Sequence, residues 1–423
     1  MLEIQRIRND KNSIIEGLKK RHFNAESIID ELLSIDEKWR IYKSQMETTA
    51  SELNQLSKEI GILFREGKAD EANAIKGQTA ELKAREADLK EKVEAFEAQI
   101  QERMYQLPNV PNELVKAGKS EEDNEMVEAH GEPVQFNFTP LPHWELATKL
   151  NLIDFELGVK ITGAGFPVYI GKGAKLQRAL IGFFLDEAAA AGYAEHQVPH
   201  VVNETSGYGT GQLPDKEGQM YHIGDDDLYL IPTGEVPLTN MYRGAMFPDD
   251  NFSIKLTGHT PCFRREAGSY GAHVRGLNRL HQFDKVEIVR IEPSENSYKV
   301  LDEMVDHVKS LLSELNLPFR ILRLCGGDLG FTSALTYDFE VYSKAQKRWL
   351  EVSSVSNFES FQSNRLKLRI EKGNKEKELA HTLNGSALAL PRIVAALLEN
   401  NQEDNKVHLP KVLHSYCGFK LID

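Results

Sequence analysis

Two long stripes of apolar residues constrain the fold of the first hundred residues more than any other feature. Between residues 32 and 63 apolar side chains recur every three or four positions, and the same rhythm returns from 75 to 100 after the polar stretch 67–70. Two such stripes joined by a short turn predict an antiparallel helical hairpin. A helix over residues 28–64 would be roughly 55 Å long, so we expect the hairpin to project as a coiled-coil arm.

The charge of this arm leaves its role open. Residues 28–104 hold 12 Lys and Arg against 17 Asp and Glu, and the whole chain carries 51 − 64 = −13 charges at pH 7. That is the wrong sign for binding nucleic acid through bulk charge, so an RNA partner would have to be held by a local patch. Dimerisation, the commoner use of heptads, is the alternative role.

The arm ends where the chain can no longer continue a helix. Residues 107–112 read Leu-Pro-Asn-Val-Pro-Asn, and a polar run follows to about residue 130. We therefore expect an N-terminal domain over 1–106, a linker over 107–130 and a second domain over 131–423.

The second domain alternates strand-like and helical segments. Strands are predicted at 166–170, 228–231, 286–291 and 339–342. Helices are predicted at 174–191, 295–315 and 386–400. Short polar connections and few crossover helices favour an α+β domain, with an antiparallel sheet flanked by helices.

Cysteine usage and the N-terminus bear on the compartment. The three cysteines are widely spread and form no Cys-x-x-Cys pair, which argues against a disulfide framework or a zinc site. Residues 1–6 carry charges where a signal peptide needs an apolar core. The best apolar run, 387–398, is broken by Pro391 and Arg392 and is too short to span a bilayer. We expect a soluble cytoplasmic protein.

The stretch 262–266, Cys-Phe-Arg-Arg-Glu, together with 281–287 predicts two antiparallel strands joined by the loop 267–279. Such a hairpin would set guanidinium groups, carboxylates and an aromatic ring on one surface. A nucleotide needs this set, for its phosphates, its exocyclic amine and its base. A salt-bridged surface hairpin is the equally weighted alternative.

Three further polar clusters lie in the same domain. Thr233 and Glu235 would point to one side of an extended chain and accept hydrogen bonds from an ammonium group and a hydroxyl; a capping turn is the alternative. Glu351, at a strand end before hydroxyl residues, suits Mg²⁺, although a serine-rich turn is also possible. Small residues at 383–390 lead to Arg392, which can reach a phosphate, although a capped helix start fits too. That all four clusters lie in order on one domain favours a common site.

The usual nucleotide-binding loops are missing from the sequence. It contains no Gly-x-x-x-x-Gly-Lys-Ser/Thr loop, no Gly-x-Gly-x-x-Gly after a strand and no His-x-Gly-His signature. If the chain binds ATP, it does so without a P-loop or a dinucleotide-binding domain.

With these residues in view, the chain resembles the seryl-tRNA synthetases, class II aminoacyl-tRNA synthetases of the bacterial type. The resemblance covers essentially the whole chain, including the helical hairpin and the Leu-Pro-Asn-x-Pro linker. It rests further on Tyr-Gly-Thr-Gly-Gln-Leu-Pro at 208–214, Thr-Gly-Glu-Val-Pro-Leu-Thr-Asn at 233–240, the 263–268 hairpin and Asn-Gly-Ser at 384–386. Class II motif 1 resembles 174–191 leading to Pro199, motif 2 resembles 262–287, and motif 3 resembles 383–400.

The resemblance implies a serine–tRNA ligase. Such an enzyme activates L-serine with ATP to seryl-adenylate and transfers it to tRNA(Ser), and to tRNA(Sec) where that is present. The chemistry is in-line attack of a carboxylate on the α-phosphorus without a covalent enzyme intermediate, so catalysis is positioning plus charge stabilisation.

The resemblance also assigns residues. Its catalytic residues are Arg264, Glu351 and Arg392. Its serine-binding residues are Thr233, Gly234, Glu235, Arg264, Glu287, Asn384 and Ser386. Its ATP-binding residues are Arg264, Arg265, Glu266, Leu280, Phe283, Glu351, Val352, Ser353, Ser354 and Arg392. Glu351 and Ser354 would hold Mg²⁺ with ATP. The implied assembly is a homodimer, in which the arm of one subunit holds the long variable arm of a tRNA acting at the other.

The chain departs from the family pattern at four positions. Arg265 replaces a serine in motif 2, and we expect its side chain on the surface. Leu335 stands where a lysine is often found, and Ala387 and Ala389 stand where glycines are common. None of these changes removes a charged catalytic position.

Two other functions fit parts of the sequence. One is a catalytically silent synthetase-like protein that binds serine or RNA, but it would not need the full ATP set. The other is an amino acid:carrier-protein ligase on the same catalytic fold, but those enzymes lack the helical arm.

Overall fold

The computed structural model describes residues 1–248, 252–267, 275–372, 376–403 and 405–423. The chain forms two compact units. One unit, the arm unit, comprises Leu2–Glu16 and Asn24–Pro108. The other, the sheet unit, comprises Met1, Gly17–Phe23 and Asn109–Asp423.

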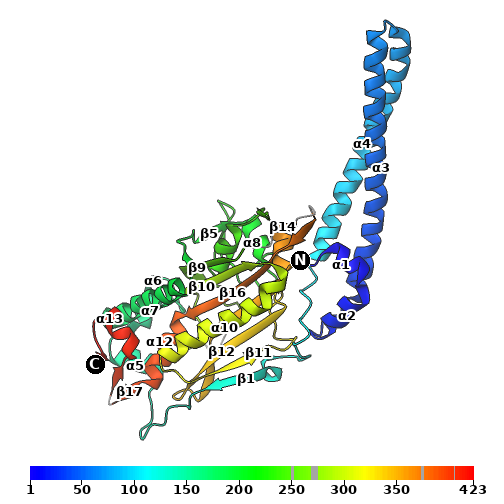
Figure 1. The fold of residues 1–423 in the computed structure, drawn as a ribbon. Helices are drawn as coiled ribbons and strands as arrows, with labels where there is room; N and C mark the ends of the chain where they lie inside the picture. Colours follow the sequence, from blue (N-terminus) through cyan, green and yellow to red (C-terminus); the bar gives the residue numbers. More distant parts are fainter. Residues whose placement is uncertain (249–251, 268–274, 373–375, 404) are drawn as a thin grey trace. The chain divides into compact units, whose positions relative to one another are not determined.

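Two long helices form the arm. After the short helices α1 (Ile4–Asn9) and α2 (Lys11–Lys19), α3 (Glu26–Arg65) and α4 (Ala69–Met104) run side by side in opposite directions (Figure 1). Near the base of the arm the Tyr42 and Phe96 rings stack with centroids 5.5 Å apart, and Trp39 Nε1 donates to a Glu97 oxygen at 3.1 Å. The predicted helical hairpin is confirmed.

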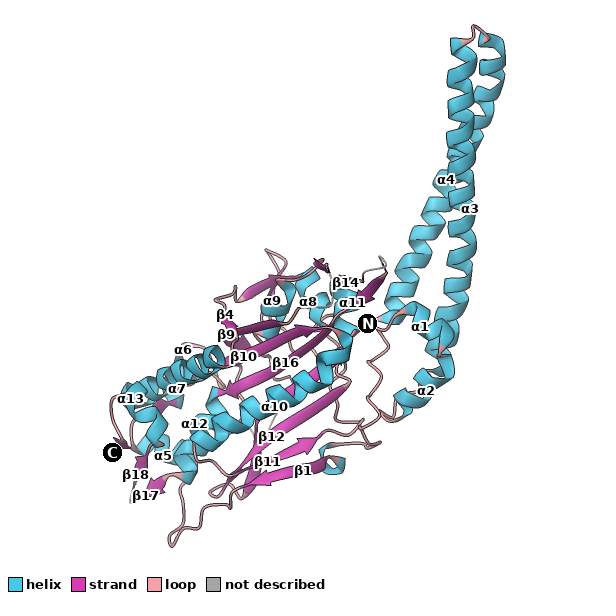
Figure 2. Cartoon of the chain, viewed as in Figure 1, coloured by secondary structure: helices cyan, strands magenta, loops and turns pink. Residues whose placement is uncertain are grey.

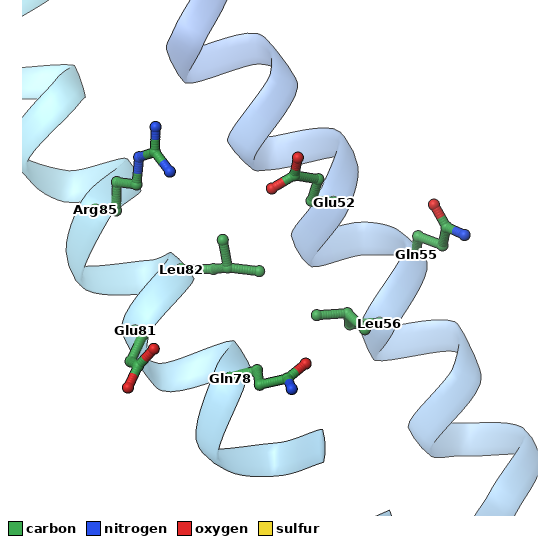
Figure 3. Close-up of a pocket in the computed structure, with 7 residues that line it drawn as sticks. All are labelled: Glu52, Gln55, Leu56, Gln78, Glu81, Leu82 and Arg85. Carbon is green, nitrogen blue, oxygen red and sulfur yellow. The ribbon is translucent and has the colours of Figure 1, made fainter.

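Fully buried side chains become rarer along α3 and α4 toward the tip of the arm, although Ala72 near the tip is buried. The base buries apolar side chains from both helices, among them Ile29, Leu32, Val93 and Met104. Farther out, Leu56 and Leu82 face each other across a small pocket, as Figure 3 shows. The rest of its lining is polar and consists of Glu52, Gln55, Gln78, Glu81 and Arg85.

An eight-stranded sheet forms the centre of the other unit. Its strand order is β1-β11-β12-β13-β16-β10-β9-β4, and all neighbours are antiparallel except the short β4, which pairs parallel to β9. The strands are β1 (Glu125–His130), β4 (Ala194–Glu195), β9 (Ile254–Phe263), β10 (Gln282–Glu292), β11 (Phe319–Arg323), β12 (Leu335–Ser343), β13 (Arg348–Glu359) and β16 (His381–Ala389). The α+β class is confirmed, and β1 lies within the segment 107–130 predicted as a linker.

The two faces of this sheet differ in chemistry. Helices α7 (Gly171–Ala190), α10 (Ser297–Glu314) and α12 (Leu390–Asn400) pack on one face (Figure 2), where Val286, Ile288 and Val355 join the apolar core. Because side chains alternate along a strand, Lys285 and Glu287 of β10 point to the opposite face. On that face lie the short helices α9 (Glu235–Asn240) and α11 (Phe361–Leu366).

Smaller elements complete the unit. The helices are α5 (His143–Lys149), α6 (Phe155–Ile161), α8 (Glu204–Thr210) and α13 (His414–Cys417). The strands are β2 (Ile153–Asp154), β3 (Val168–Tyr169), β5 (Val201–Asn203), β6 (His222–Ile223), β7 (Leu228–Leu230), β8 (Met246–Phe247), β14 (Arg369–Glu371), β15 (Lys377–Leu379), β17 (Gln402–Glu403), β18 (Lys406–His408) and β19 (Leu421–Ile422). Within the described part of the chain, no helix has the length and apolar character that crossing a membrane requires.

One predicted helix boundary is wrong. The helix expected over 386–400 begins at Leu390, and residues 386–389 are the last residues of β16. Pro391 lies in the first turn of α12, where no intrahelical N–H is needed, so it marks the true start.

Candidate active site

Two buried carboxylates face each other on the polar side of the sheet. Glu287 of β10 is 0% exposed and Glu235, the first residue of α9, is 6% exposed. Lys285 Nζ lies 2.5 Å from a Glu287 oxygen and donates to Thr233 Oγ1 at 2.8 Å. The Thr233 hydroxyl in turn donates to Glu287 at 2.9 Å. One cation thus offsets part of the negative charge of the pair.

Side-chain amides bridge the same carboxylates. Asn384 of β16 donates to Glu235 at 3.0 Å and to Glu287 at 2.9 Å. Gln362 of α11 donates to the other Glu235 oxygen at 2.6 Å. Burial, and then the charge of Glu287, raise the pKa of Glu235 to about 7. This cluster is net acidic and favours a cationic ligand such as an ammonium group.

Thr233 and Glu235 reach this cluster from a turn. The expectation of an extended chain is wrong, because Thr233 lies in the turn before α9 and its hydroxyl accepts from the Glu235 backbone N–H at 3.2 Å. At Gly234 a Cβ would lie 3.2 Å from Thr260 Oγ1 and 3.3 Å from Glu287 Cβ. The missing side chain lets the start of α9 pack tightly on β9 and β10.

Arg264 lies beside this turn. It follows β9, donates its Nε to the Pro232 carbonyl at 3.3 Å, and has its guanidinium carbon 5.2 Å from the centre of the Phe283 ring. Phe283 pairs with Cys262 across β9 and β10. The two antiparallel strands of the predicted hairpin are therefore present, and they set a cation and an aromatic ring next to the acidic cluster. Residues 268–274 of the predicted loop 267–279 lie outside the described residues.

Arg392 and Glu351 form a second charged group. Arg392, in the first turn of α12, donates to the Glu351 carbonyl at 2.7 Å and lies 3.3 Å from a Glu351 carboxylate oxygen. It also donates to the Asn278 carbonyl at 3.3 Å. Glu351 lies inside β13 rather than at its end, and its side chain is 47% exposed. The residues after it are also strand, so the serine-rich turn is excluded.

The other residues assigned to ATP have mixed placements. Glu266 pairs with Arg279 at 2.8 Å, and Arg265 is exposed. The side chains of Leu280 and Val352 lie in the apolar core. The Ser353 hydroxyl donates to the Ser386 carbonyl at 2.6 Å and thereby joins β13 to β16.

The departures at 335, 387 and 389 fall in and beside the core. Leu335 and Ala387 are 1% and 0% exposed and belong to the apolar cluster, while Ala389 is half-buried at the end of β16. Leu335 therefore makes no contribution to the polar face.

Oxygen ligands for a divalent cation meet around β12 and β13. Asp338 pairs with Ser354 across these strands, and Asp338 Oδ1 is buried without a hydrogen-bond partner among the described residues. Burial, and then the charge of Glu351, raise the pKa of Asp338 well above its ordinary value. The described residues include no group of three or more His, Cys, Asp or Glu able to hold a metal by themselves. Two carboxylates and a hydroxyl nevertheless fit Mg²⁺, which commonly takes its remaining ligands from substrate phosphates and water.

Three residues of the site were missed in the sequence. Lys285 lies two positions before Glu287, so strand alternation puts both on one face and provided a usable signal. Asp338 lies one position before the strand predicted at 339–342. If that strand is extended by one residue, the same alternation assigns Asp338 to one face of the sheet. Gln362 comes from α11, and no local pattern links it to Glu235.

Three features together define a class of protein. They are the antiparallel sheet, the β9–β10 hairpin and the helical arm. The family model described as tRNA synthetase class II core domain (G, H, P, S and T) matches residues 220–401, and the Seryl-tRNA synthetase N-terminal domain matches residues 1–111. The sheet unit is thus that of a class II aminoacyl-tRNA synthetase.

Individual relatives are similar over the full length. The chain is 51% identical to a serine–tRNA ligase of Salinibacter ruber, covering 100% of this chain and 99% of the relative. It is 44% identical to a serine–tRNA ligase of Methylacidiphilum infernorum, covering 98% and 99%. A crystal structure of seryl-tRNA synthetase from Pyrococcus horikoshii complexed with ATP superimposes with a TM-score of 0.91 at 31% identity, covering 100% and 99%. The chain belongs to the seryl-tRNA synthetase family.

Proposed function

We propose that this chain activates L-serine with ATP and transfers the seryl group to tRNA(Ser). The observation that carries the proposal is the buried Glu235–Glu287 pair, bridged by Asn384 and placed next to the Arg264 guanidinium. An amino acid needs opposite charges for its two ends, and this site offers carboxylates on one side and a guanidinium on the other. The membership of the chain in the seryl-tRNA synthetase family supports serine as that amino acid.

Serine would be held through its ammonium and hydroxyl groups. Glu235 and Glu287 supply anionic acceptors, and Thr233 and Ser386 supply hydroxyls. Gly234 and Asn384 complete the serine-binding set, with Asn384 holding the two carboxylates at a fixed separation. Arg264 would contact the serine carboxylate and the α-phosphate of ATP.

ATP would lie across the motif 2 hairpin and the start of α12. Phe283 offers a ring face for the adenine base. Arg392 would lie on the other face of the base and near the γ-phosphate. Glu266 would offer its carboxylate to the adenine amine. Leu280, Val352, Ser353 and Ser354 would line the site, Leu280 through its backbone. Arg265 would flank the ATP site through its backbone alone, because its side chain is exposed.

The reaction at this site is an in-line displacement. A serine carboxylate oxygen forms a bond to the α-phosphorus, the bond from that phosphorus to the β-phosphate oxygen breaks, and pyrophosphate leaves. Arg264 stabilises the charge that builds on the α-phosphate oxygens, and no covalent bond to the protein forms.

Glu351 and Ser354 would hold Mg²⁺ together with ATP, and we add Asp338 to this set. Bound Mg²⁺ supplies positive charge that stabilises the phosphate oxygens. Glu351 also orients Arg392 through the 2.7 Å and 3.3 Å contacts, so its role does not end with the cation.

We further propose a cytoplasmic homodimer, with the N-terminal domain 1–106 as the tRNA-binding part, 107–130 as a linker and 131–423 as the catalytic part. The helical arm of one subunit would hold the long variable arm of tRNA(Ser), and of tRNA(Sec) where present. The arm is acidic overall, so these contacts should be few and led by shape.

Adjacent arginines provide a matched test of the activation step. Arg264→Ala should lower the rate of serine-dependent ATP–pyrophosphate exchange by about a hundredfold or more, because it removes charge stabilisation of the transition state. Arg265→Ala removes the same charge one residue away from an exposed position and should stay within about threefold of the unchanged protein. Equal losses in the two variants would contradict the assignment of Arg264.

A further inference from the structure

A fully buried histidine joins α5 to α12. His143 and Glu399 are both 0% exposed. The His143 backbone N–H donates to Glu399 Oε1 at 2.9 Å, and ring Nδ1 lies 2.7 Å from the same oxygen. Gln346 Nε2 donates to Oε1 at 2.9 Å, and the Ser343 hydroxyl donates to Oε2. Burial alone would raise the pKa of Glu399, but these hydrogen bonds outweigh it and hold the pKa below its ordinary value.

The second ring nitrogen fixes the tautomer of His143. Nε2 accepts the backbone N–H of Leu277 at 2.8 Å, so Nε2 carries no proton and Nδ1–H donates to Glu399. Gly276 permits this close approach, because a Cβ there would lie 2.3 Å from Nε2 and its φ is +69°. The ring therefore joins the backbone at Leu277 to the carboxylate on α12.

His143 holds the segment of residues 276–279, and this segment also contacts two of the residues assigned to ATP. The Asn278 carbonyl accepts from Arg392 Nε at 3.3 Å, and Arg279 lies 2.8 Å from a Glu266 oxygen. Glu399 follows Arg392 by seven residues on α12, which is about two helical turns, so both lie on one side of the helix. The His143–Glu399 pair thus ties the segment and the helix of Arg392 together.

We propose that His143 and Glu399 are positioning residues for ATP. They hold the backbone of residues 276–279 in a fixed position. From that position the Asn278 carbonyl orients Arg392, and the Arg279 side chain orients Glu266. The inference rests on the proposed function, because Arg392 and Glu266 have ATP roles only there. The serine cluster around Glu235 is built from α9, α11, β10 and β16, so serine binding should be insensitive to this pair.

The test compares substitutions at two histidines of the sheet unit. In ATP–pyrophosphate exchange, His143→Ala should raise KM for ATP about tenfold or more and leave KM for serine within about twofold. His143→Gln keeps an acceptor for the Leu277 N–H and should recover part of the loss. His307→Ala is the control, because His307 of α10 is half-buried and its ring centre lies 5.8 Å from that of Tyr193; both KM values should stay unchanged.

The tautomer gives a readout independent of activity. In ¹⁵N spectra of histidine-labelled protein, His143 should show a protonated Nδ1 and an unprotonated Nε2. A protonated Nε2, an unchanged KM for ATP in His143→Ala, or equal rises in both KM values would overturn the inference. If His143→Ala does not fold, an unchanged KM for ATP in His143→Gln does the same.

Failure of the proposed function would look different. A wild-type chain without serine-dependent exchange would overturn that function, and the ATP affinities of the same variants, measured by calorimetry, would still decide the role of His143. An affinity lowered in His143→Ala but not in His307→Ala supports positioning, and equal affinities contradict it.

Discussion

Glu235 offers a simple physical test of the chemistry of the site. It is buried beside a second carboxylate, and its pKa is raised to about 7. Lys285 compensates only part of the charge, because it contacts Glu287 and Thr233 rather than Glu235 directly. The unbalanced negative charge lowers the stability of the folded protein. Such an arrangement is expected where a cationic ligand completes the charge balance.

This gives a pH dependence with a definite sign. Because the Glu235 pKa is raised in the folded state, folded protein binds more protons than unfolded protein between about pH 4.5 and 7, and stability falls as pH rises through that window. The contribution is about 3 kcal/mol. In Glu235→Gln the free energy of unfolding, measured by urea denaturation at each pH, should lose this decline.

An exposed glutamate provides the control. Glu156→Gln on α6 should give a pH profile parallel to that of the unchanged protein. If the Glu235→Gln profile is also parallel, the buried carboxylate does not titrate as described.

The sequence revealed residues of the site where local pattern and family motif coincide. Arg264, Phe283 and Glu287 fall on a hairpin whose two strands are visible as apolar flanks, and the structure brings them together. Lys285 could have been found by strand alternation. Gln362 and His143 could not, because each meets its partners through tertiary packing between segments more than a hundred residues apart.

At the scale of elements, the arm is a pair of helices whose packing is uneven along its length. The apolar stripe predicted both helices to within a few residues, since α3 and α4 need little beyond their own periodicity. The start of α12 was missed because 386–389 are as apolar and small as a helix start, and their pairing with β10 is long-range.

The uneven packing predicts graded local stability. The base buries Leu32 and Val93 and holds the stacked, half-buried Tyr42–Phe96 pair, whereas Leu56 and Leu82 meet amid polar side chains. Amide hydrogens of residues 55–82 should therefore exchange faster than those of 29–42 and 93–104 in hydrogen-exchange mass spectrometry. Equal protection along both helices would show that the polar lining does not weaken the contact.

Shortening the arm separates tRNA use from adenylate chemistry. Replacing residues 46–92 by a short turn joins the helices in the register of the Tyr42–Phe96 pair and keeps the Trp39–Glu97 hydrogen bond. This variant should lose tRNA(Ser) charging and keep ATP–pyrophosphate exchange within about twofold. If charging survived, the arm would be structural only, and loss of both activities would require a check of folding by circular dichroism.

At the scale of the whole molecule, the proposed homodimer places the arm and the site of one tRNA on different subunits. Mixed dimers of the shortened-arm variant and Arg264→Ala should then regain charging, because one subunit keeps an arm and the other keeps a working site. Each variant alone should be inactive in charging. Mixed dimers confirmed by mass spectrometry but still inactive would contradict use of the arm across subunits.

The whole chain also shows where composition misleads. A net charge of −13 favours small-molecule enzymes over nucleic-acid binders, yet the chain belongs to a family that takes its name from a tRNA. Bulk charge reports non-specific attraction, whereas a long arm can recognise shape with few phosphate contacts.

Amino-acid-dependent ATP–pyrophosphate exchange measures whether the acidic cluster beside Arg264 selects serine for activation by ATP. With the purified wild-type chain, serine should support exchange. Alanine, which leaves the buried polar groups unpaired, should give a kcat/KM roughly 10⁴-fold lower. No exchange with serine, or equal exchange with serine and alanine, would show that this cluster does not select serine.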